Sequence, residues 1–291
     1  MEWTECLRKT IDYIENHLLE EIHNQELGKE SAISPFYLQK GFKVMTGITI
    51  SEYIRNRRLY LAALELILND DKIIDVALLY GYESAESFTR AFSRFHGISP
   101  TGIKKNPSKI KSYLPLKISI SILGGTAMDC LVEKMNGFIV VGLRRRFDYD
   151  SAYGQIPLFW EEFCNTYMMG KGSKENQQIV NRCMIGEFGV CISRPDDESG
   201  FDYLIAGKFD ETEVPTDMVI YEIPEMEWAK FRCIGPLAGN FQSLNTRIFS
   251  EWLPENNEFE IASGISLEWY SCGDTTASDY ESGIWIPVKR K

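Results

Sequence analysis

Two sets of side chains in this sequence could do chemistry, and the first lies in the stretch 81–100. The stretch is typical of a turn followed by a short helix that stops at Ser99-Pro100. One helix face is apolar at i, i+3, i+4 and i+7, the pattern of a helix packed on a core: Phe88, Ala91, Phe92 and Phe95. The opposite face carries groups able to bind phosphates or base edges: Glu86, Ser87, Arg90, Ser93 and Arg94. Arginine binds phosphates or guanine, and glutamate accepts from cytosine, so this face predicts DNA binding.

The second set is centred on Glu268, in the otherwise apolar segment 265–270. If the segment is a strand, alternation places Glu268 on one face with Ser266 and Tyr270. A carboxylate among aromatic rings is poorly solvated, and an organic cation would offset that cost through charge and ring contacts. The alternative is an edge-strand carboxylate in water. The segment therefore offers a candidate carboxylate for binding an organic cation, with that alternative open.

The elements around the first set form a helix-turn-helix. An apolar helix is expected just upstream (Ile74, Val76, Ala77, Leu79), and it ends at Tyr80-Gly81, where glycine supplies the left-handed position. The same unit occurs once more, where Ser34-Pro35 gives an N-cap and a first-turn proline. Residues 27–32 precede it as the first helix of that pair. We expect Leu38, Phe42 and Met45 to be buried there, and the following to point outward: Phe36, Tyr37, Gln39, Lys40 and Lys43.

One continuous helix is expected between the two units, over residues 51–68. The segment has no glycine or proline and is rich in good helix formers. At 1.5 Å per residue it spans roughly 27 Å, close to the distance of about 34 Å between successive major-groove faces of a duplex. The sequence thus predicts a rigid rod that holds two DNA-reading helices about one DNA turn apart.

Residues 4–105 resemble the DNA-binding domain of the AraC family of transcription regulators. The resemblance rests on these landmarks: Ser34, Leu38, Phe42-Lys43, Gly47, Tyr53, Arg58-Leu59, Ala62, Ile74, Ala77, Gly81-Tyr82, Ser84, Phe88, Arg90, Phe92, Gly97 and Ser99-Pro100. It departs at Gly28, at Lys104 and at Gly41, which sits inside the first reading helix and costs roughly 1 kcal/mol of helix propensity relative to Ala.

The resemblance implies which residues face double-stranded DNA: Phe36, Gln39 and Lys40 in the first unit, and Glu86, Ser87, Thr89 and Arg90 in the second. Tyr37, Lys43 and Arg94 complete the set of candidates. For any one of these side chains the alternative is an ordinary solvated helix face. Two complete units in one chain let a monomer span a full site, so monomer and homodimer both remain open.

The charge of the chain divides unevenly. The net charge of −11 seems unsuited to a DNA-binding protein, but residues 1–115 hold 15 basic and 15 acidic residues. Within residues 31–111 there are 12 basic and 7 acidic residues, a net charge of +5. We therefore expect a local positive potential, modest non-specific affinity and a moderate dependence on salt.

The second half of the chain changes from helical to alternating patterns after the basic linker 104–111. A half-buried strand is expected over Leu116–Ile122, ended by Gly124-Gly125. Beyond it the order strand-helix-strand-strand occurs twice: 130–148, 155–168, 188–193 and 201–209, then 218–235, 240–253, 259–270 and 284–288. The expected fold class is an all-α double helix-turn-helix domain followed by a duplicated α+β domain.

This duplication resembles the GyrI-like effector-binding domain over about 128–290. The similarity rests on the topology and on three segments: 226–231, 267–270 and 280–288. Such domains bind small, often aromatic and cationic molecules in a cleft between their halves, so the resemblance implies that Glu268 faces a cleft. Candidates for its aromatic wall are Trp160, Tyr203, Tyr270 and Trp285, each with ordinary core packing as the alternative. The implied domains are 1–106, a linker with first strand over 107–127, and 128–291.

These readings together predict a sequence-specific transcription regulator, an activator by family tendency, whose C-terminal domain binds a small-molecule effector. The effector would change the contacts of that domain with the reader across 104–116, or with RNA polymerase. Some GyrI-like proteins are hydrolases, and Glu268 with Tyr203 or Tyr270 could do acid–base work of that kind. A protein-interaction module is the third alternative. We expect a regulator and no enzyme.

Several site classes are not indicated by the sequence. The seven cysteines form no Cys-x-x-Cys pair and there are three histidines, so we expect buried reduced thiols, no metal site and no cofactor. The first residues lack the pattern of a signal peptide, and no apolar run approaches the ~20 residues of a membrane span. We therefore expect a cytoplasmic protein with no membrane partner.

Overall fold

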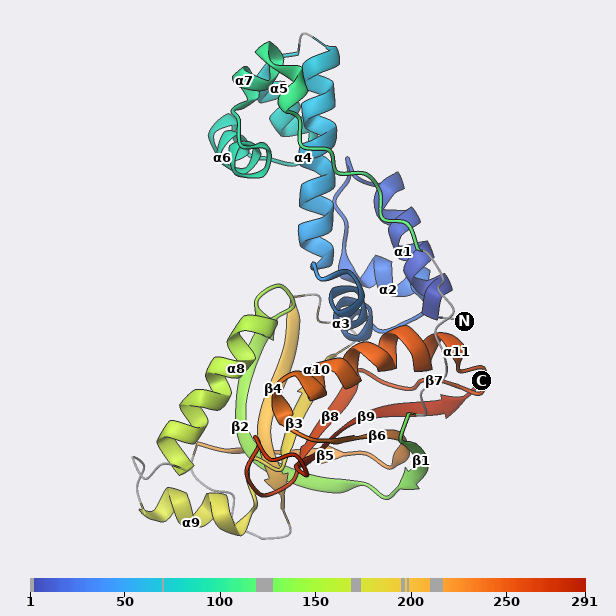
Figure 1. The fold of residues 1–291 in the computed structure, drawn as a ribbon, viewed down its shortest axis with the longest axis vertical. Coiled ribbons are helices and arrows are strands. Elements are labelled where there is room, and N and C mark those ends of the chain that lie inside the picture. The colour runs from blue at the N-terminus through green and yellow to red at the C-terminus, as the bar shows by residue number, and fades with distance from the viewer. Residues whose placement is uncertain are drawn as a thin grey trace.

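The computed structural model describes residues 3–69, 71–118, 128–168, 174–194, 197, 199–209 and 217–291. A helical N-terminal part stands on a C-terminal part built from one large sheet with helices (Figure 1). This confirms the expected fold class, an all-α region followed by a duplicated α+β domain.

The described residues of the N-terminal part form seven α-helices, and their bounds match the sequence pattern closely. They are α1 (Trp3–Asn16), α2 (Asn24–Ser31), α3 (Pro35–Thr46), α4 (Ile50–Leu68), α5 (Ile73–Leu79), α6 (Ala85–His96) and α7 (Pro100–Lys105). Helices α2 and α3 form the first helix-turn-helix, and α5 and α6 form the second. The 19-residue α4 is the expected rod, about 28 Å long at 1.5 Å per residue. It holds α6 far from the sheet, whereas α3 lies against the C-terminal part (Figure 1).

The two reading helices begin and end in the same way, fifty positions apart. The hydroxyl of Ser34 accepts from the backbone N–H of Tyr37, and the hydroxyl of Ser84 accepts from that of Ser87. Each helix ends at a glycine with positive φ, 77° at Gly47 and 73° at Gly97, a conformation that glycine adopts without a Cβ penalty. The caps therefore fix both helix lengths at twelve residues.

The C-terminal sheet has nine antiparallel strands among the residues that the structure describes. They are β1 (Cys130–Met135), β2 (Phe138–Asp148), β3 (Phe188–Ile192), β4 (Gly200–Lys208), β5 (Val219–Ile223), β6 (Met226–Ile234), β7 (Phe259–Ile261), β8 (Ile265–Tyr270) and β9 (Glu281–Arg290). Their order is β1-β6-β9-β8-β3-β4-β2-β5, with β7 beside β9. Two four-stranded halves thus meet where β3 pairs with β8, which confirms the duplication.

Each half carries a long helix that continues into a turn of π-helix. The first half has α8 (Ala152–Phe163), a π-helix (Cys164–Met168) and α9 (Lys174–Arg182). The second half has α10 (Leu237–Arg247), a π-helix (Ile248–Trp252) and α11 (Leu253–Glu255). Helices α8 and α10 pack on one face of the sheet, where their apolar residues share a core with α1 and α3. The other face has a separate core that includes Phe188, Trp228 and Leu267.

The linker differs from the expectation. Residues 107–109 form a short 3-10 helix, and residues 116–118 of the expected strand have no regular structure, while its remainder lies outside the described residues. The backbone N–H of Leu116 donates to the Tyr53 hydroxyl at 3.1 Å, and Arg57 Nη1 donates to the Tyr113 carbonyl at 2.5 Å. These bonds hold the linker beside α4, so its described residues do not pair with a strand of the sheet (Figure 1).

Two smaller expectations of burial are wrong. Met45 is 37% exposed, because it lies in the last turn of α3, where its sulfur accepts a hydrogen bond from the Trp3 indole N–H at 3.1 Å at the edge of the core. The expectation of buried thiols holds for Cys6, Cys183, Cys191 and Cys233, but Cys130 and Cys164 are only partly buried and Cys272 is exposed.

Candidate DNA-reading and effector-binding sites

The outer face of α6 is open to solvent. Glu86, Arg90 and Arg94 are exposed, and Ser87 and Thr89 are partly exposed. On the opposite face Phe88 and Phe92 are fully buried and hold the helix on the core of the second unit. The structure therefore brings together, on one accessible face, all five DNA-facing candidates of this unit.

The corresponding face of α3 is covered. Phe36, Tyr37 and Gln39 are only 2%, 0% and 5% exposed. The Tyr37 hydroxyl donates to the backbone carbonyl of Ile265 in β8 at 2.7 Å, and the ring of Phe36 lies edge-on to Phe201 at 5.1 Å. The expectation that these three residues point into solvent is wrong, because the C-terminal domain packs on Phe36 and Tyr37, and Gln39 donates to Asn24 of α2 at 2.7 Å.

The two lysines of α3 are partly buried as well. Lys40 Nζ lies 5.8 Å from the centre of the Phe36 ring, and Lys43 Nζ forms an ion pair with Glu52 at 3.5 Å. The backbone carbonyl of Lys40 accepts a hydrogen bond from the Tyr153 hydroxyl of α8 at 3.3 Å. Both candidates are therefore engaged with protein groups.

Glu268 lies on the helix-covered face of the sheet and is partly buried. Its Oε2 accepts from the Tyr203 hydroxyl at 2.7 Å and from the Tyr270 hydroxyl at 3.0 Å. The Tyr203 oxygen in turn accepts from the Trp160 indole N–H at 2.9 Å. Since β8 lies between β3 and β9, the alternative of an edge-strand carboxylate is wrong. Three aromatic candidates thus surround one carboxylate.

A glycine makes this network possible. Tyr203 in β4 and Glu268 in β8 flank β3, and the Tyr203 side chain crosses over Gly189 to reach the carboxylate. A Cβ at Gly189 would lie 2.1 Å from the Tyr203 hydroxyl and 2.8 Å from Glu268 Oε2. Gly189 was missed from the sequence, although a glycine inside an apolar strand signals a close approach.

The two tyrosines remain protonated donors over the physiological pH range. Burial, and then the negative charge of Glu268, hold the pKa of the Tyr203 and Tyr270 hydroxyls well above the usual 10. Both hydroxyl groups therefore keep donating to the Glu268 carboxylate, whose oxygens remain acceptors among the aromatic rings of the site.

Trp285 is not part of this site, which corrects the expectation. It pairs with Leu267 across β8 and β9, so it lies on the opposite face from Glu268. There it packs against Phe188 and Trp228, with Lys230 Nζ 4.0 Å from its ring centre. The side-chain alternation of paired strands could have excluded it once the register was known.

A cavity of about 940 Å³ opens above the network, between α8, α10 and α3. Its aromatic lining goes beyond the predicted residues and comprises Phe36, Tyr149, Tyr153, Trp160, Phe201, Phe241, Tyr270 and Tyr280. Its charged lining residues among those described are Glu187, Glu268 and Lys40. A volume of this size, with apolar walls and few polar groups, is typical of sites for drug-sized molecules.

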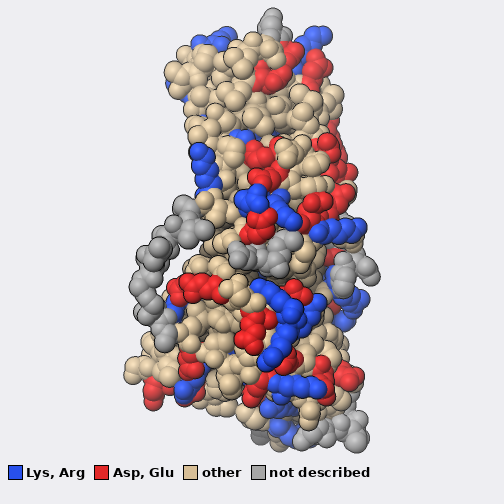
Figure 2. Space-filling view, turned by 90° about the vertical axis from the view of Figure 1, so that its right-hand side faces the viewer, with Lys and Arg blue, Asp and Glu red and all other residues tan. Residues whose placement is uncertain are grey.

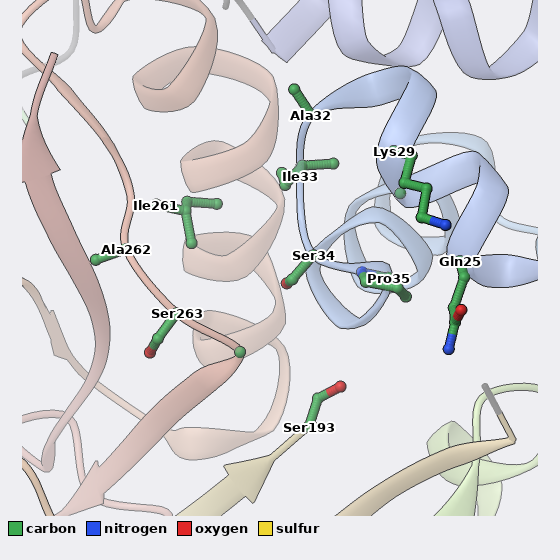
Figure 3. A pocket seen from close by; sticks show the side chains of 12 residues that line it. Gln25, Lys29, Ala32, Ile33, Ser34, Pro35, Ser193, Ile261, Ala262 and Ser263 are labelled. Carbon is green, nitrogen blue, oxygen red and sulfur yellow. The ribbon is translucent and has the colours of Figure 1, made fainter. Parts of the chain in front are cut away.

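A second, smaller cavity of about 450 Å³ lies where the turn between α2 and α3 faces the C-terminal domain. In Figure 3, Ser34 and Pro35 of the turn stand opposite Ser193, and Ile261, Ala262 and Ser263 line the other side. Both cavities therefore lie at the junction between the first reading unit and the sheet domain.

Two family models match the chain. The model described as a GyrI-like small molecule binding domain matches residues 128–289, more than half of the chain, and that of a helix-turn-helix domain matches residues 27–106. The protein is an AraC-type transcription regulator with a GyrI-like small molecule binding domain. Both resemblances drawn from the sequence are thereby confirmed.

Curated relatives of this regulator match less than half of its length. The HTH-type transcriptional regulator YbfP of Bacillus subtilis is 37% identical over 131 residues, which cover 43% of this chain and 44% of YbfP. The regulatory protein SoxS of Salmonella typhimurium is 36% identical over 101 residues, which cover 35% of this chain and 94% of SoxS.

Two solved structures resemble separate parts of the regulator. The structure of SAV2435 bound to tetraphenylphosphonium is 18% identical, covers 56% of this chain and 94% of SAV2435, and has a TM-score of 0.45. An AraC-type transcriptional regulator from Chromobacterium violaceum is 20% identical, covers 35% of this chain and 91% of its own, with a TM-score of 0.34.

The described residues contain no cluster of His, Cys, Asp and Glu side chains suited to a metal ion. Among the same residues, no helix has the length and apolar character needed to cross a lipid bilayer.

Proposed function

We propose that this regulator binds double-stranded DNA in a sequence-specific way through α6 and, when it is accessible, α3. The observation that supports this most strongly is the solvent-exposed face of α6, with Arg90 and Arg94 on a helix fixed by buried phenylalanines. The face drawn in Figure 2 is turned away from α6, and on it acidic and basic side chains are interspersed without a broad basic surface.

Fluorescence anisotropy with Arg90→Ala tests the DNA-binding proposal. Duplexes from the DNA flanking the gene of this protein, or selected in vitro, are titrated at two salt concentrations. We expect salt-dependent binding that falls on substitution, by about 1–3 kcal/mol if Arg90 contacts guanine. Wild-type binding no tighter than to random duplex would contradict sequence-specific reading.

We further propose that the cavity binds an organic cation with aromatic groups. Glu268 supplies the charge, and Trp160, Tyr270 and their aromatic neighbours supply ring faces that attract cations. Calorimetric titration of tetraphenylphosphonium, a permanent aromatic cation, tests the proposal, with Glu268→Gln expected to weaken binding at least tenfold. Equal binding by both proteins would place the cation elsewhere.

The hydrolase alternative uses the same groups. Because both tyrosine hydroxyls have a raised pKa and donate to Glu268, a hydrolase here would need Glu268 as the base and a tyrosine as the acid. We propose sensing as the role of the cavity because the same chain carries a helix-turn-helix domain. Turnover of a reactive ester or epoxide that disappears in Glu268→Gln would favour the hydrolase instead.

The remaining assignments are proposals of the same kind. We propose a reader over 1–106, a linker over 107–127 and an effector domain over 128–291, acting in the cytoplasm as a monomer or homodimer. We propose that the DNA-bound regulator activates transcription through RNA polymerase. It is supported by the relative AarP of Providencia stuartii, named a transcriptional activator, which is 35% identical over 89 residues.

A further inference from the structure

The effector cavity is not closed by the C-terminal domain alone. Three of its lining residues, Phe36, Gln39 and Lys40, belong to α3, the first reading helix. Phe36 packs on Phe201, and the carbonyl of Lys40 accepts from Tyr153 at 3.3 Å, so α3 meets residues that themselves line the cavity. A helix expected to read DNA therefore forms one wall of the site for the small molecule.

Further contacts hold α3 in this position. The Tyr37 hydroxyl bonds to the Ile265 carbonyl at 2.7 Å inside the protein. On another side of the helix, Gly41 lies so close to Trp3 of α1 and Phe249 of the second π-helix that a Cβ would meet them at 2.2 and 2.7 Å. The Trp3 and Phe249 rings contact each other with centroids 5.4 Å apart. The docked arrangement is thus a packed interface and not a loose encounter.

The two reading helices differ in the residues that fill matching positions. Fifty residues separate Phe36 from Glu86, Lys40 from Arg90 and Gly41 from Ala91. Only the docked helix has an aromatic ring on its outer face and a glycine where a neighbouring domain approaches. These differences are those expected of a helix that contacts the C-terminal domain in one state and DNA in another.

We propose that α3 is a shared wall, so that an effector in the cavity and DNA compete for it. This inference rests on the proposed effector site. The face formed by Phe36, Gln39 and Lys40 cannot contact a major groove while it lines the cavity. A ligand in the cavity touches these residues only in the docked state, and a ligand shifts an equilibrium toward the state that it binds better. A cavity of about 940 Å³ admits a drug-sized molecule without displacing α3. Effector binding therefore keeps the first unit off DNA and weakens binding to the full site.

Reciprocal titrations test the competition in the full-length protein. Tetraphenylphosphonium is titrated by calorimetry with and without a saturating duplex obtained by in vitro selection. The Kd for the cation should rise about tenfold with DNA, and the Kd for DNA should rise by the same factor with the cation, because coupling between two ligands is reciprocal. A cation Kd that DNA leaves unchanged, or lowers, would overturn the proposal while leaving the effector site intact.

A second arm needs no ligand. Phe249→Ala removes the ring that packs on Trp3 and Gly41, so it should release α3 and lower the Kd for the full site several-fold. Phe138→Ala is the matched control, because Phe138 packs on Phe188 at the opposite face of the sheet. We expect its DNA affinity to equal that of wild type. A folded Phe249→Ala protein, by circular dichroism and melting, with unchanged DNA affinity would overturn the docking competition.

The two arms separate the failure of this inference from that of the effector site. If wild type binds no tetraphenylphosphonium, the proposed cation site is refuted, and so is the competition between cation and DNA. The Phe249→Ala result then decides independently whether docking of α3 opposes DNA binding.

Discussion

At the scale of single residues, the site depends on two tyrosine hydroxyl groups that donate to Glu268 and on the absence of a side chain at Gly189. Tyr203 and Tyr270 direct their protons at the same oxygen of Glu268, and Trp160 supports Tyr203 from behind. The carboxylate is thereby held in one orientation before a ligand arrives. Such pre-organisation raises affinity because fewer groups need to be ordered on binding.

Gly189→Ala should disrupt this arrangement. The added methyl would overlap the Tyr203 hydroxyl, whose ring has no free space since Tyr203 is fully buried. We expect at least tenfold weaker binding of tetraphenylphosphonium and a lower melting temperature. Gly154→Ala is the control, because a Cβ there meets nothing within 4 Å and helix propensity favours alanine. Unchanged cation binding in Gly189→Ala would mean that the Tyr203–Glu268 bond does not shape the site.

At the scale of elements, the behaviour of α3 follows from Gly41. A glycine inside a helix lowers helix stability by roughly 1 kcal/mol relative to alanine. At Gly41 the missing side chain lets Trp3 and Phe249 pack directly against the helix backbone. Helix α6 has Ala91 at the matching position, and α4 holds it away from the sheet domain (Figure 1).

Gly41→Ala should therefore strengthen α3 as a helix and loosen its docking. We expect tighter DNA binding without effector, measured by anisotropy, and a shift in the emission of the tryptophans because Trp3 loses its packing. A variant with a higher melting temperature but wild-type DNA affinity would show that the Trp3 ring simply moves aside.

A histidine couples the second unit to the linker. His96 Nδ1 accepts from the backbone N–H of Lys111 at 3.1 Å, so the proton sits on Nε2, which is 3.1 Å from the Leu59 carbonyl. Burial lowers the pKa of His96 below its ordinary 6.5, and the nearby charge of Lys111 lowers it further, although the bond to Leu59 opposes them. Since the unfolded chain takes up this proton first, the stabilisation is complete above pH ~6.5 and is lost as the pH falls below that value.

Denaturant unfolding at pH 7.5 and 5.5 checks this expectation. Wild type should lose more unfolding free energy on acidification than His96→Gln, in which glutamine can still donate to the Leu59 carbonyl. The difference is at most about 1.4 kcal/mol for each unit by which the pKa is displaced. Equal losses in both proteins would assign the pH dependence to other groups.

At the scale of the whole molecule, the sequence predicted most elements and missed how the two domains meet. Caps such as Ser34 and Gly97 are local signals, and alternation placed Glu268 with Tyr270, so helices, strands and half of the site were accessible. Trp285 was misplaced because its face depends on the pairing of β9 with β8. The burial of Phe36 and Tyr37 could not be predicted from the sequence, because an outward-facing aromatic residue is equally suited to a contact with DNA and to a contact with another domain.

The docked arrangement predicts that the two reading helices contribute unequally until α3 is released. In wild type only α6 is free to bind, so Arg90→Ala should weaken DNA binding strongly and Lys40→Ala only slightly. In the Phe249→Ala protein α3 is released, and α6 already holds the protein on DNA. The second contact, made by α3, then forms within the same complex at high effective concentration. The loss caused by Lys40→Ala should then grow, and the slope of log Kd against log salt should steepen by about 0.9 for each added phosphate contact. The four proteins form a double-mutant cycle that measures the coupling between Lys40 and Phe249. A loss from Lys40→Ala that is equal in both backgrounds would mean that Phe249→Ala does not bring α3 onto DNA, whereas a larger loss in the Phe249→Ala background would show that release of this helix completes the reader.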